Sequence, residues 1–166
     1  MEIIVSDSGD MGHAKRAREV VAAEQGLRDI SADEILHRMD NGQFLSFYDG
    51  ESHSDAIAYS GLRHYAGSWY ELGPMWVSPE ERQKGVGTFV YKTAVERWGH
   101  LNLFGLSNNP TSKKLQEPLG FSVVSVTDIS PLVTARAAYD LVRGGLPKWR
   151  NIVEGNGRTY MARHAN

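Results

Sequence analysis

The stretch EERQKGVGTFVYKTAVERW, residues 80–98, joins a charged turn with two glycines to an apolar helical pattern. Its apolar residues recur at helical spacing, which predicts a helix with one buried face: Val86, Phe89, Val90, Ala94 and Trp98. Gly85 and Gly87 lack a Cβ, so a ligand can approach the backbone closely. The first amides of a helix have no partner within it, and the helix dipole favours negative charge there. The turn is therefore predicted to hold an anion, most naturally a phosphate group.

Two familiar phosphate loops do not match this turn, although Arg82 and Lys84 add positive charge beside it. A P-loop would need a lysine and a hydroxyl residue after the second glycine of a longer loop. A dinucleotide-binding fingerprint would need a third glycine where Val90 stands. An ordinary turn before a helix remains the alternative interpretation.

The composition is that of one globular domain, which we expect to span residues 1–166. Hydrophobic residues make up 41% and charged residues 23%, and the formal net charge is -2. This balance gives no general reason to expect a polyanionic partner such as nucleic acid. The chain has no cysteine, which excludes disulfides, a thiolate zinc site and a cysteine nucleophile.

The first sixteen residues contain an apolar run of only four residues, too short for a secretory signal. No stretch approaches the roughly 20 apolar residues of a membrane span. We therefore expect a soluble, cytoplasmic protein without a membrane partner.

Positive charge is concentrated near the carboxyl end. Residues 131–166 hold six Lys/Arg and two Asp/Glu, a local net charge of +4. The rest of the chain holds 12 Lys/Arg and 18 Asp/Glu, a net charge of -6. A solvated basic tail is one interpretation, and a rim for an anionic cofactor or acceptor is the other.

The rest of the pattern predicts a mixed α/β fold. Ser31 and Glu34 form a capping-box pattern for a helix to about Asp40, after an earlier helix over 12–25 that Gly26 would stop. Strands are predicted at 2–6, 43–49, 55–65, 68–77, 101–106, 121–126 and 157–164. Further helices are predicted at 110–119 and 131–145. Strands joined by short turns suggest an antiparallel meander, and the later strand–helix–strand order implies crossovers and some parallel pairing.

The sequence MWVSPEERQKGVGTFV resembles the acyl-CoA-binding motif of the GNAT superfamily of N-acyltransferases. That motif, Arg/Gln-x-x-Gly-x-Gly/Ala at a strand-to-helix junction, stands here at residues 82–87, after the strand end Val77-Ser78-Pro79. The sequence NPTSKKLQEPLGF is similar to the second signature of the family, an Asn before a short helix with a Leu-Gly-Phe ending. The resemblance covers roughly residues 42–126, with 131–166 as a divergent segment.

This resemblance implies a GNAT-like fold: a central mixed sheet with an antiparallel meander, splayed central strands around acetyl-CoA, and helices on both faces. Pro74 agrees with a bulge in the strand before the turn, since proline within a strand needs an edge or a bulge. The implied acyl-CoA contacts are Met75, Trp76 and Val77 for the pantetheine arm, Arg82, Gln83, Lys84, Gly85, Val86, Gly87 and Thr88 for the pyrophosphate, and Asn109 and Ser112.

The resemblance also implies a catalytic base, and Glu71 is the candidate because it lies on the strand that leads into the glycine turn. A carboxylate can accept the amine proton directly or through water. A solvent-facing glutamate is the alternative, and Glu51 and His64 are weaker candidates for the base.

The family usually has a tyrosine that protonates the leaving thiolate, but this chain has Gln116 at that position. Three other tyrosines are available, although a structural role is the simpler interpretation of each: Tyr91, Tyr139 and Tyr160. Lys113 and Lys114 are interpreted as a solvated face or as contacts to CoA phosphates. The histidines show no ligand spacing, so we predict no metal.

The function expected from the resemblance is acetyl transfer from acetyl-CoA to a primary amine. A catalytically silent acyl-CoA-binding or interaction module is the alternative, and a nucleic acid or acidic protein bound by residues 131–166 is a third. The acceptor itself is not predicted. Aromatic residues such as Tyr59, Trp69 and Trp149 are candidates to frame it, and LPKWRN at 146–151 is a candidate acceptor wall or homodimer contact.

Overall fold

The computed structural model describes residues 2–24, 30–50, 52–107, 110–144 and 159–165. The elements, in chain order, are β1 (Ile3–Ser6), α1 (Met11–Ala23), α2 (Ala32–Asp40), β2 (Phe44–Asp49), β3 (Ser52–Ala66), β4 (Trp69–Val77), α3 (Val86–Trp98), β5 (Asn102–Ser107), α4 (Pro110–Gln116), β6 (Ser122–Val124), α5 (Val126–Ile129), α6 (Pro131–Gly144) and β7 (Thr159–Arg163). Short 3₁₀ turns occur at Pro79–Glu81 and Glu117–Leu119.

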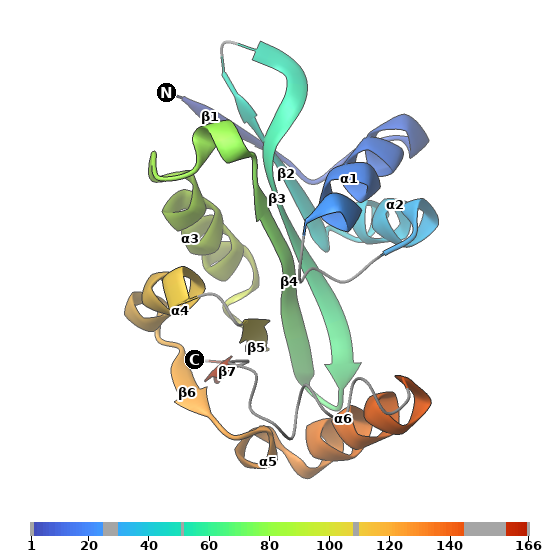
Figure 1. Ribbon diagram of the computed structural model, residues 1–166, viewed down its shortest axis with the longest axis vertical. Helices are drawn as coiled ribbons and strands as arrows, with labels where there is room; N and C mark the ends of the chain where they lie inside the picture. Colours follow the sequence, from blue (N-terminus) through green and yellow to red (C-terminus); the bar gives the residue numbers. More distant parts are fainter. Residues whose placement is uncertain (1, 25–29, 51, 108–109, 145–158, 166) are drawn as a thin grey trace. The chain divides into compact units, whose positions relative to one another are not determined.

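In the described part of the chain, the strands form one mixed sheet in the order β1-β2-β3-β4-β5-β7-β6 (Figure 1). This confirms the predicted mixed α/β class. The chain also divides into two compact units. The first contains Met1–Arg63 and Leu72–Arg97, and the second contains His64–Glu71 and Trp98–Asn166.

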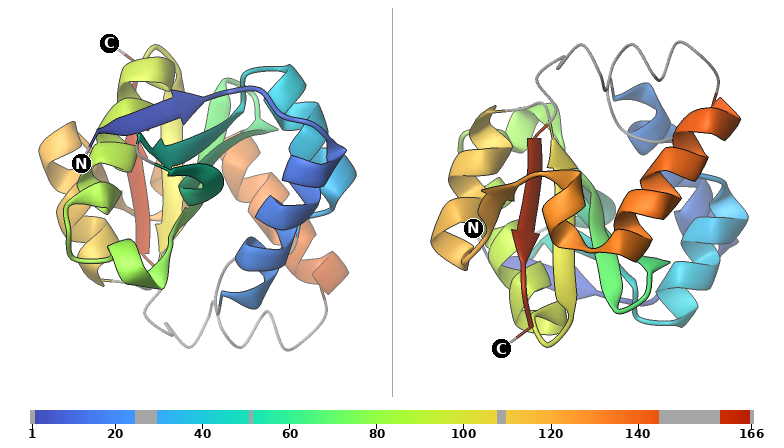
Figure 2. Two further views of the ribbon diagram at one scale, coloured as in Figure 1. Left: turned by 90° about the horizontal axis from the view of Figure 1, so that it is seen from above. Right: turned by 90° about the horizontal axis from the view of Figure 1, so that it is seen from below.

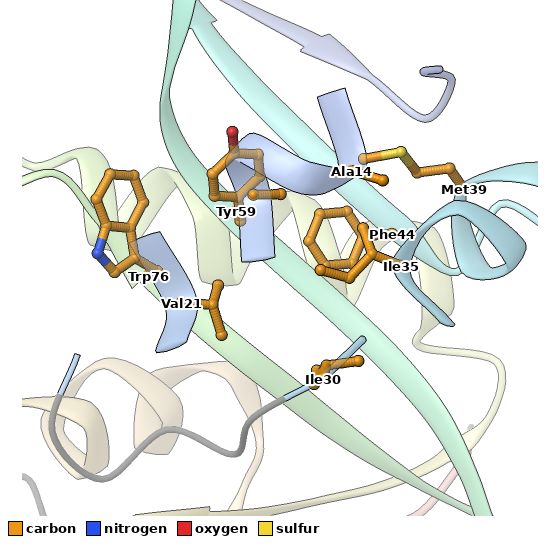
Figure 3. Close-up of a cluster of buried hydrophobic side chains, with 9 residues drawn as sticks. Ala14, Val21, Ile30, Ile35, Met39, Phe44, Tyr59 and Trp76 are labelled. Atoms are coloured by element: carbon orange, nitrogen blue, oxygen red, sulfur yellow. The ribbon is translucent and has the colours of Figure 1, made fainter. Parts of the chain in front are cut away.

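In the first unit, β2 pairs antiparallel with β3, as predicted for these two strands of the meander. The amino-terminal strand β1 also pairs antiparallel with β2. Helices α1 and α2 cover one face of these strands, and their apolar side chains meet those of the sheet in one cluster (Figure 3). In this cluster the Tyr59 and Trp76 rings are 5.6 Å apart, and Phe44 lies 5.6 Å from Tyr59. The cluster fixes the helices on the strand that leads to the glycine turn.

Helix α3 contacts the opposite face of the same strands. Phe47 is three residues from Phe44 and so points to the other side of β2, where it meets Phe89 edge-on at 6.2 Å. The predicted buried face of α3 is confirmed at Val86, Val90, Ala94 and Trp98. The prediction is wrong at Phe89, which is 38% exposed. Phe89 lies at the flank of the buried stripe because positions 86, 90, 94 and 98 define its centre, and Tyr91 is buried on the other flank.

The second unit is built on β5. Residues Trp69–Glu71 of β4 pair in parallel with Asn102–Phe104, and β7 pairs antiparallel with both β5 and β6. Figure 2 shows β7 in red between its two neighbours. A cluster of Trp69, Phe104 and Val133 with residues of α5 and β7 forms the core of this unit.

Local signals correctly predicted most elements, and one clear difference lies in the second unit. Residues 121–126 were expected as one strand, but the strand ends at Val124 and helix α5 begins at Val126. A capping box causes this change, because the Ser125 backbone donates to Asp128 while the Ser125 side chain accepts from the Asp128 amide. The stop predicted at Gly26 lies outside the described residues.

Candidate functional site

The predicted anion turn lies between the 3₁₀ turn Pro79–Glu81 and α3. The Phe89 amide donates to the Gly85 carbonyl at 3.1 Å, which makes Gly85 the N-cap residue immediately before α3. By helix geometry, the amides of Val86, Gly87 and Thr88 then have no acceptor within α3. Val86 is 2% exposed and anchors the first turn in the core, while Thr88 is exposed. The turn therefore presents a set of donors at a fixed helix end.

Gly85 leaves open space beside these donors. A Cβ built at this position would meet no atom within 4 Å, and φ is +88°. Gly85 is also exposed. A left-handed backbone favours glycine, so both the conformation and the open space explain the residue. A phosphate group could approach the amides of α3 without meeting a side chain at this point.

Gln83 adopts the left-handed conformation as well, with φ of 67°. For a residue with a side chain this conformation costs roughly 1–2 kcal/mol. The turn is therefore held in its shape by contacts elsewhere.

The two cations beside Gln83 provide such contacts. Arg82 donates from Nε to the Val77 carbonyl at 3.1 Å and from Nη2 to Glu24 Oε2 at 2.6 Å. Lys84 Nζ donates to Glu81 Oε1 at 3.0 Å. Both predicted cations thus lie at the turn, and each is already engaged by a carboxylate.

Strand β4 leads into the turn with alternating exposure. Leu72, Pro74 and Trp76 are buried, whereas Met75 and Val77 are partly exposed. The Trp76 side chain packs against Tyr59 and is 8% exposed, so the part of this residue left to contact a pantetheine arm is its backbone.

The strand is irregular at Pro74. The Gly73–Pro74 peptide is cis, and Gly73 has φ of 157°. On β3, a Cβ at Gly61 would lie 2.9 Å from the Gly73 carbonyl oxygen, so glycine allows the two strands to approach closely here.

Three other predicted positions belong to the second unit. Glu71 is half-buried on β4, where it pairs with Phe104 of β5. Gln116 is 3% exposed at the end of α4 and donates from Nε2 to Ser112 Oγ at 3.1 Å. The Gln116 amide also packs on Gly105, whose Cβ would be 3.4 Å from Nε2. Gln116 is therefore a buried structural amide in a position where the family resemblance leads us to expect a tyrosine.

Several predicted residues lie outside the described residues or in ordinary structural roles. Asn109, Glu51 and the segment 146–151 are outside the described part of the chain. Tyr91 is 7% exposed in the core, and Tyr139 is 55% exposed with Arg136 over its ring. Tyr160 packs against the second-unit core, and Lys114 is exposed.

One polar cluster was not predicted. His13 of α1 lies with Nε2 3.0 Å from Ser46 Oγ and 2.9 Å from the Tyr48 hydroxyl, both on β2. Burial and the nearby Arg16 lower the pKa of His13, although Asp10 opposes this shift. Burial raises the pKa of Tyr59, on the adjacent strand, to about 12. The residue order contains no signal for this cluster because His13 is 33 residues from Ser46 and 35 residues from Tyr48.

Across the described residues, no helix has the length and apolar character needed to cross a membrane. The same residues contain no group of three or more His, Cys, Asp or Glu side chains arranged to hold a metal ion.

Comparison with solved structures supports the fold. The protein Rv2747 from Mycobacterium tuberculosis, in complex with CoA and NLQ, matches with a TM-score of 0.67 at 12% identity, covering 97% of this chain and 98% of that one. The ribosomal-protein-S18-alanine N-acetyltransferase from Escherichia coli matches with a TM-score of 0.63 at 12% identity, covering 99% and 95%. N-acetylglutamate synthase from Neisseria gonorrhoeae matches with a TM-score of 0.64 at 17% identity. This chain is covered fully but spans only 36% of that synthase.

Comparison with curated proteins gave no match. The model of the acetyltransferase (GNAT) family matches residues 13–121, more than half of the chain. That range includes the meander, the glycine turn, α3 and the Leu-Gly-Phe ending. The chain therefore belongs to the acetyltransferase (GNAT) family.

Proposed function

We propose that the protein is an acyl-CoA-dependent N-acyltransferase that transfers an acetyl group from acetyl-CoA to a primary amine of a small molecule or a protein. The observation that carries the proposal is the open, exposed glycine turn at the start of α3. An anion at such a helix end is stabilised by unpaired amides and by the helix dipole. Membership of the family makes the acyl-CoA phosphates the expected anion.

The residues at the turn suit a pyrophosphate. Gly85 leaves room for it, the amides of Val86 to Thr88 would donate to it, and Arg82 and Lys84 supply charge beside it. Met75 and Val77, with the backbone of Trp76, would contact the pantetheine arm. Asn109 and Ser112 remain proposed contacts from the family resemblance.

The proposed reaction needs one base from the chain. The amine nitrogen attacks the thioester carbonyl, a C–N bond forms, the C–S bond breaks, and CoA leaves as the thiolate. Glu71, on the strand that continues into Met75–Val77, would accept the amine proton directly or through water. Backbone amides of β4 would stabilise the negative charge on the carbonyl oxygen.

A catalytically silent acyl-CoA-binding module is the second candidate, and one observation favours it. Gln116 is buried and bonded to Ser112, and an amide is not a useful general acid, so this side chain would not protonate the thiolate. Binding of acetyl-CoA without turnover of any amine would support the module.

The first experiment is isothermal titration with acetyl-CoA, with desulfo-CoA and ATP as comparison ligands. The key variant is Gly85→Asp, which places a carboxylate in front of the amides and should abolish binding. Gly85→Asn is the matched control, because asparagine has the same size, tolerates positive φ and carries no charge. Binding by Gly85→Asp equal to that by Gly85→Asn would contradict a phosphate at the turn.

The second experiment tests the base in a screen of amines, peptides and aminoacyl compounds. Glu71→Gln should lower turnover roughly 10²- to 10⁴-fold and leave the Kd for acetyl-CoA unchanged. Glu96→Gln, a surface change on α3, is the control and should behave as wild type. Loss of acetyl-CoA binding in Glu71→Gln would instead indicate a structural role for Glu71.

A further inference from the structure

The glycine turn is tied at both sides of its strained residue. Gln83 has a left-handed backbone, and its two neighbours, Arg82 and Lys84, are each bonded to a carboxylate. Arg82 reaches Glu24, which lies 58 residues away at the end of α1. Lys84 reaches Glu81 in the preceding 3₁₀ turn. The shape of the turn is thus supported from outside the turn itself.

Arg82 joins three segments through one side chain. Its Nε donates to the carbonyl of Val77, the last residue of β4, and its Nη2 donates to Glu24, the residue that ends α1. A guanidinium has several donors in a fixed plane, so these two bonds together orient it and the attached backbone. The strand end, the helix end and the turn are held in one arrangement.

Glu81 is the more buried of the two carboxylates. Its side chain is 17% exposed, against 37% for Glu24. Glu81 Oε2 is fully buried and has no hydrogen-bond partner, so Lys84 provides the one ion pair of this carboxylate among the described residues. Loss of Lys84 would therefore leave this largely buried carboxylate poorly compensated.

We propose that Glu24 and Glu81 are positioning residues for the acyl-CoA phosphates, because they hold Arg82 and Lys84 and thereby preorganise the amides at the start of α3. The inference rests on the proposed function. Preorganisation and simple charge repulsion change the affinity for acetyl-CoA in opposite directions when a carboxylate is removed. A carboxylate beside an anion site repels the anion, so its removal should tighten binding if charge alone acts. If the carboxylates preorganise the turn, their removal weakens binding.

The test is the Kd for acetyl-CoA of Glu24→Ala and Glu81→Ala, measured by isothermal titration. We expect the Kd to rise roughly three- to tenfold in each variant, because exposed to half-buried charged contacts contribute energies of this size. The larger rise is expected for Glu81→Ala. Glu24→Gln and Glu81→Gln, which keep a carbonyl oxygen to accept the hydrogen bond, should recover part of the affinity. At saturating acetyl-CoA, kcat should be unchanged while the KM for acetyl-CoA rises.

Two matched controls separate this effect from general charge. Glu19→Ala on α1 and Glu80→Ala in the 3₁₀ turn remove the same charge from exposed neighbouring positions. They should leave the Kd unchanged or lower it slightly. Circular dichroism and Tm identify any variant that has lost its fold, in which case the glutamine variant is decisive.

The outcomes for the inference and for the proposed function are distinct. If the wild type does not bind acetyl-CoA, the proposed function fails and the inference falls with it. If the wild type binds and a folded alanine variant binds equally well or more tightly, the inference is refuted for that carboxylate and the proposed function stands. Weaker binding in both alanine variants but not in the controls supports the inference.

Discussion

Gly61 of β3 is the position where one added methyl group should be felt most clearly. A Cβ there would lie 2.9 Å from the Gly73 carbonyl oxygen, 3.0 Å from Pro74 Cδ and 3.3 Å from the Gly73 carbonyl carbon. These atoms belong to the backbone and to a proline ring of the adjacent strand, so none can rotate away. Gly61→Ala should therefore force β3 and β4 apart where β4 leads into Met75–Val77.

The magnitude follows from two opposing effects. Overpacking of a close contact costs about 1–3 kcal/mol. Replacement of glycine by alanine restricts the unfolded chain, which returns roughly 0.4–1 kcal/mol. The expected loss in the free energy of unfolding is about 1–2 kcal/mol, or roughly 0.5–1 M in the urea midpoint for a slope near 2 kcal/mol/M.

The adjacent residue offers a matched control of opposite sign. Ser60 is fully buried, and its hydroxyl has no hydrogen-bond partner among the described residues. Ser60→Ala removes an unsatisfied polar atom without adding volume, so it should raise the free energy of unfolding by about 1 kcal/mol. Both variants place alanine on β3, but only Gly61→Ala adds an atom against the adjacent strand.

Urea unfolding followed by tryptophan fluorescence measures both changes. Gly61→Ala should also raise the Kd for acetyl-CoA, because the altered strand precedes the proposed pantetheine contacts. A Gly61→Ala midpoint equal to or above that of the wild type would refute the steric argument. A Ser60→Ala midpoint below that of the wild type would show that the hydroxyl has a partner, such as a bound water.

Three further predictions concern titration and backbone strain. The pKa of His13 is lowered from 6.5, chiefly by burial and then by Arg16, so the unfolded chain binds more protons than the folded one as the pH falls through this region. The contribution of neutral His13 to the free energy of unfolding is therefore complete above pH 6.5 and is lost as the pH falls below it. Between pH 7.5 and 5, the urea midpoint of His13→Gln should decline less than that of the wild type. Burial raises the pKa of Tyr59 to about 12, so the folded state stays protonated where the unfolded chain, with a pKa of 10.0, ionises. The free energy of unfolding should fall by about 2 kcal/mol as the pH rises from below 10 to 12, and Tyr59→Phe should lack this fall; equal profiles for the two proteins would contradict the assignment. Finally, Gln83→Gly should relieve the left-handed strain and raise Tm, with an unchanged or lower Tm as the contrary result.

The glycine turn shows how far sequence reasoning reaches for the site. Glycines at 85 and 87 and the helical spacing after them are local features, and the structure has the turn, the exposed Gly85 and the buried Val86 in the expected places. The engagement of Arg82 by Glu24 was not predicted, because two residues 58 positions apart meet only when the chain is folded. The side chain of Trp76 likewise lies in the core beside Tyr59, a contact between two strands that residue order does not specify.

The sequence by itself determined the family and the existence and approximate position of most helices and strands. The Ser31 cap, for example, needs only the Glu34 amide three residues on, so its bond is encoded within one turn of chain. Tertiary structure alone decided that β7 enters between β5 and β6, that His13 meets Ser46 and Tyr48, and that Arg82 pairs with Glu24. Helix periodicity and caps depend on neighbours a few residues apart, whereas sheet order and long-range ion pairs depend on which buried surfaces meet when the whole chain packs.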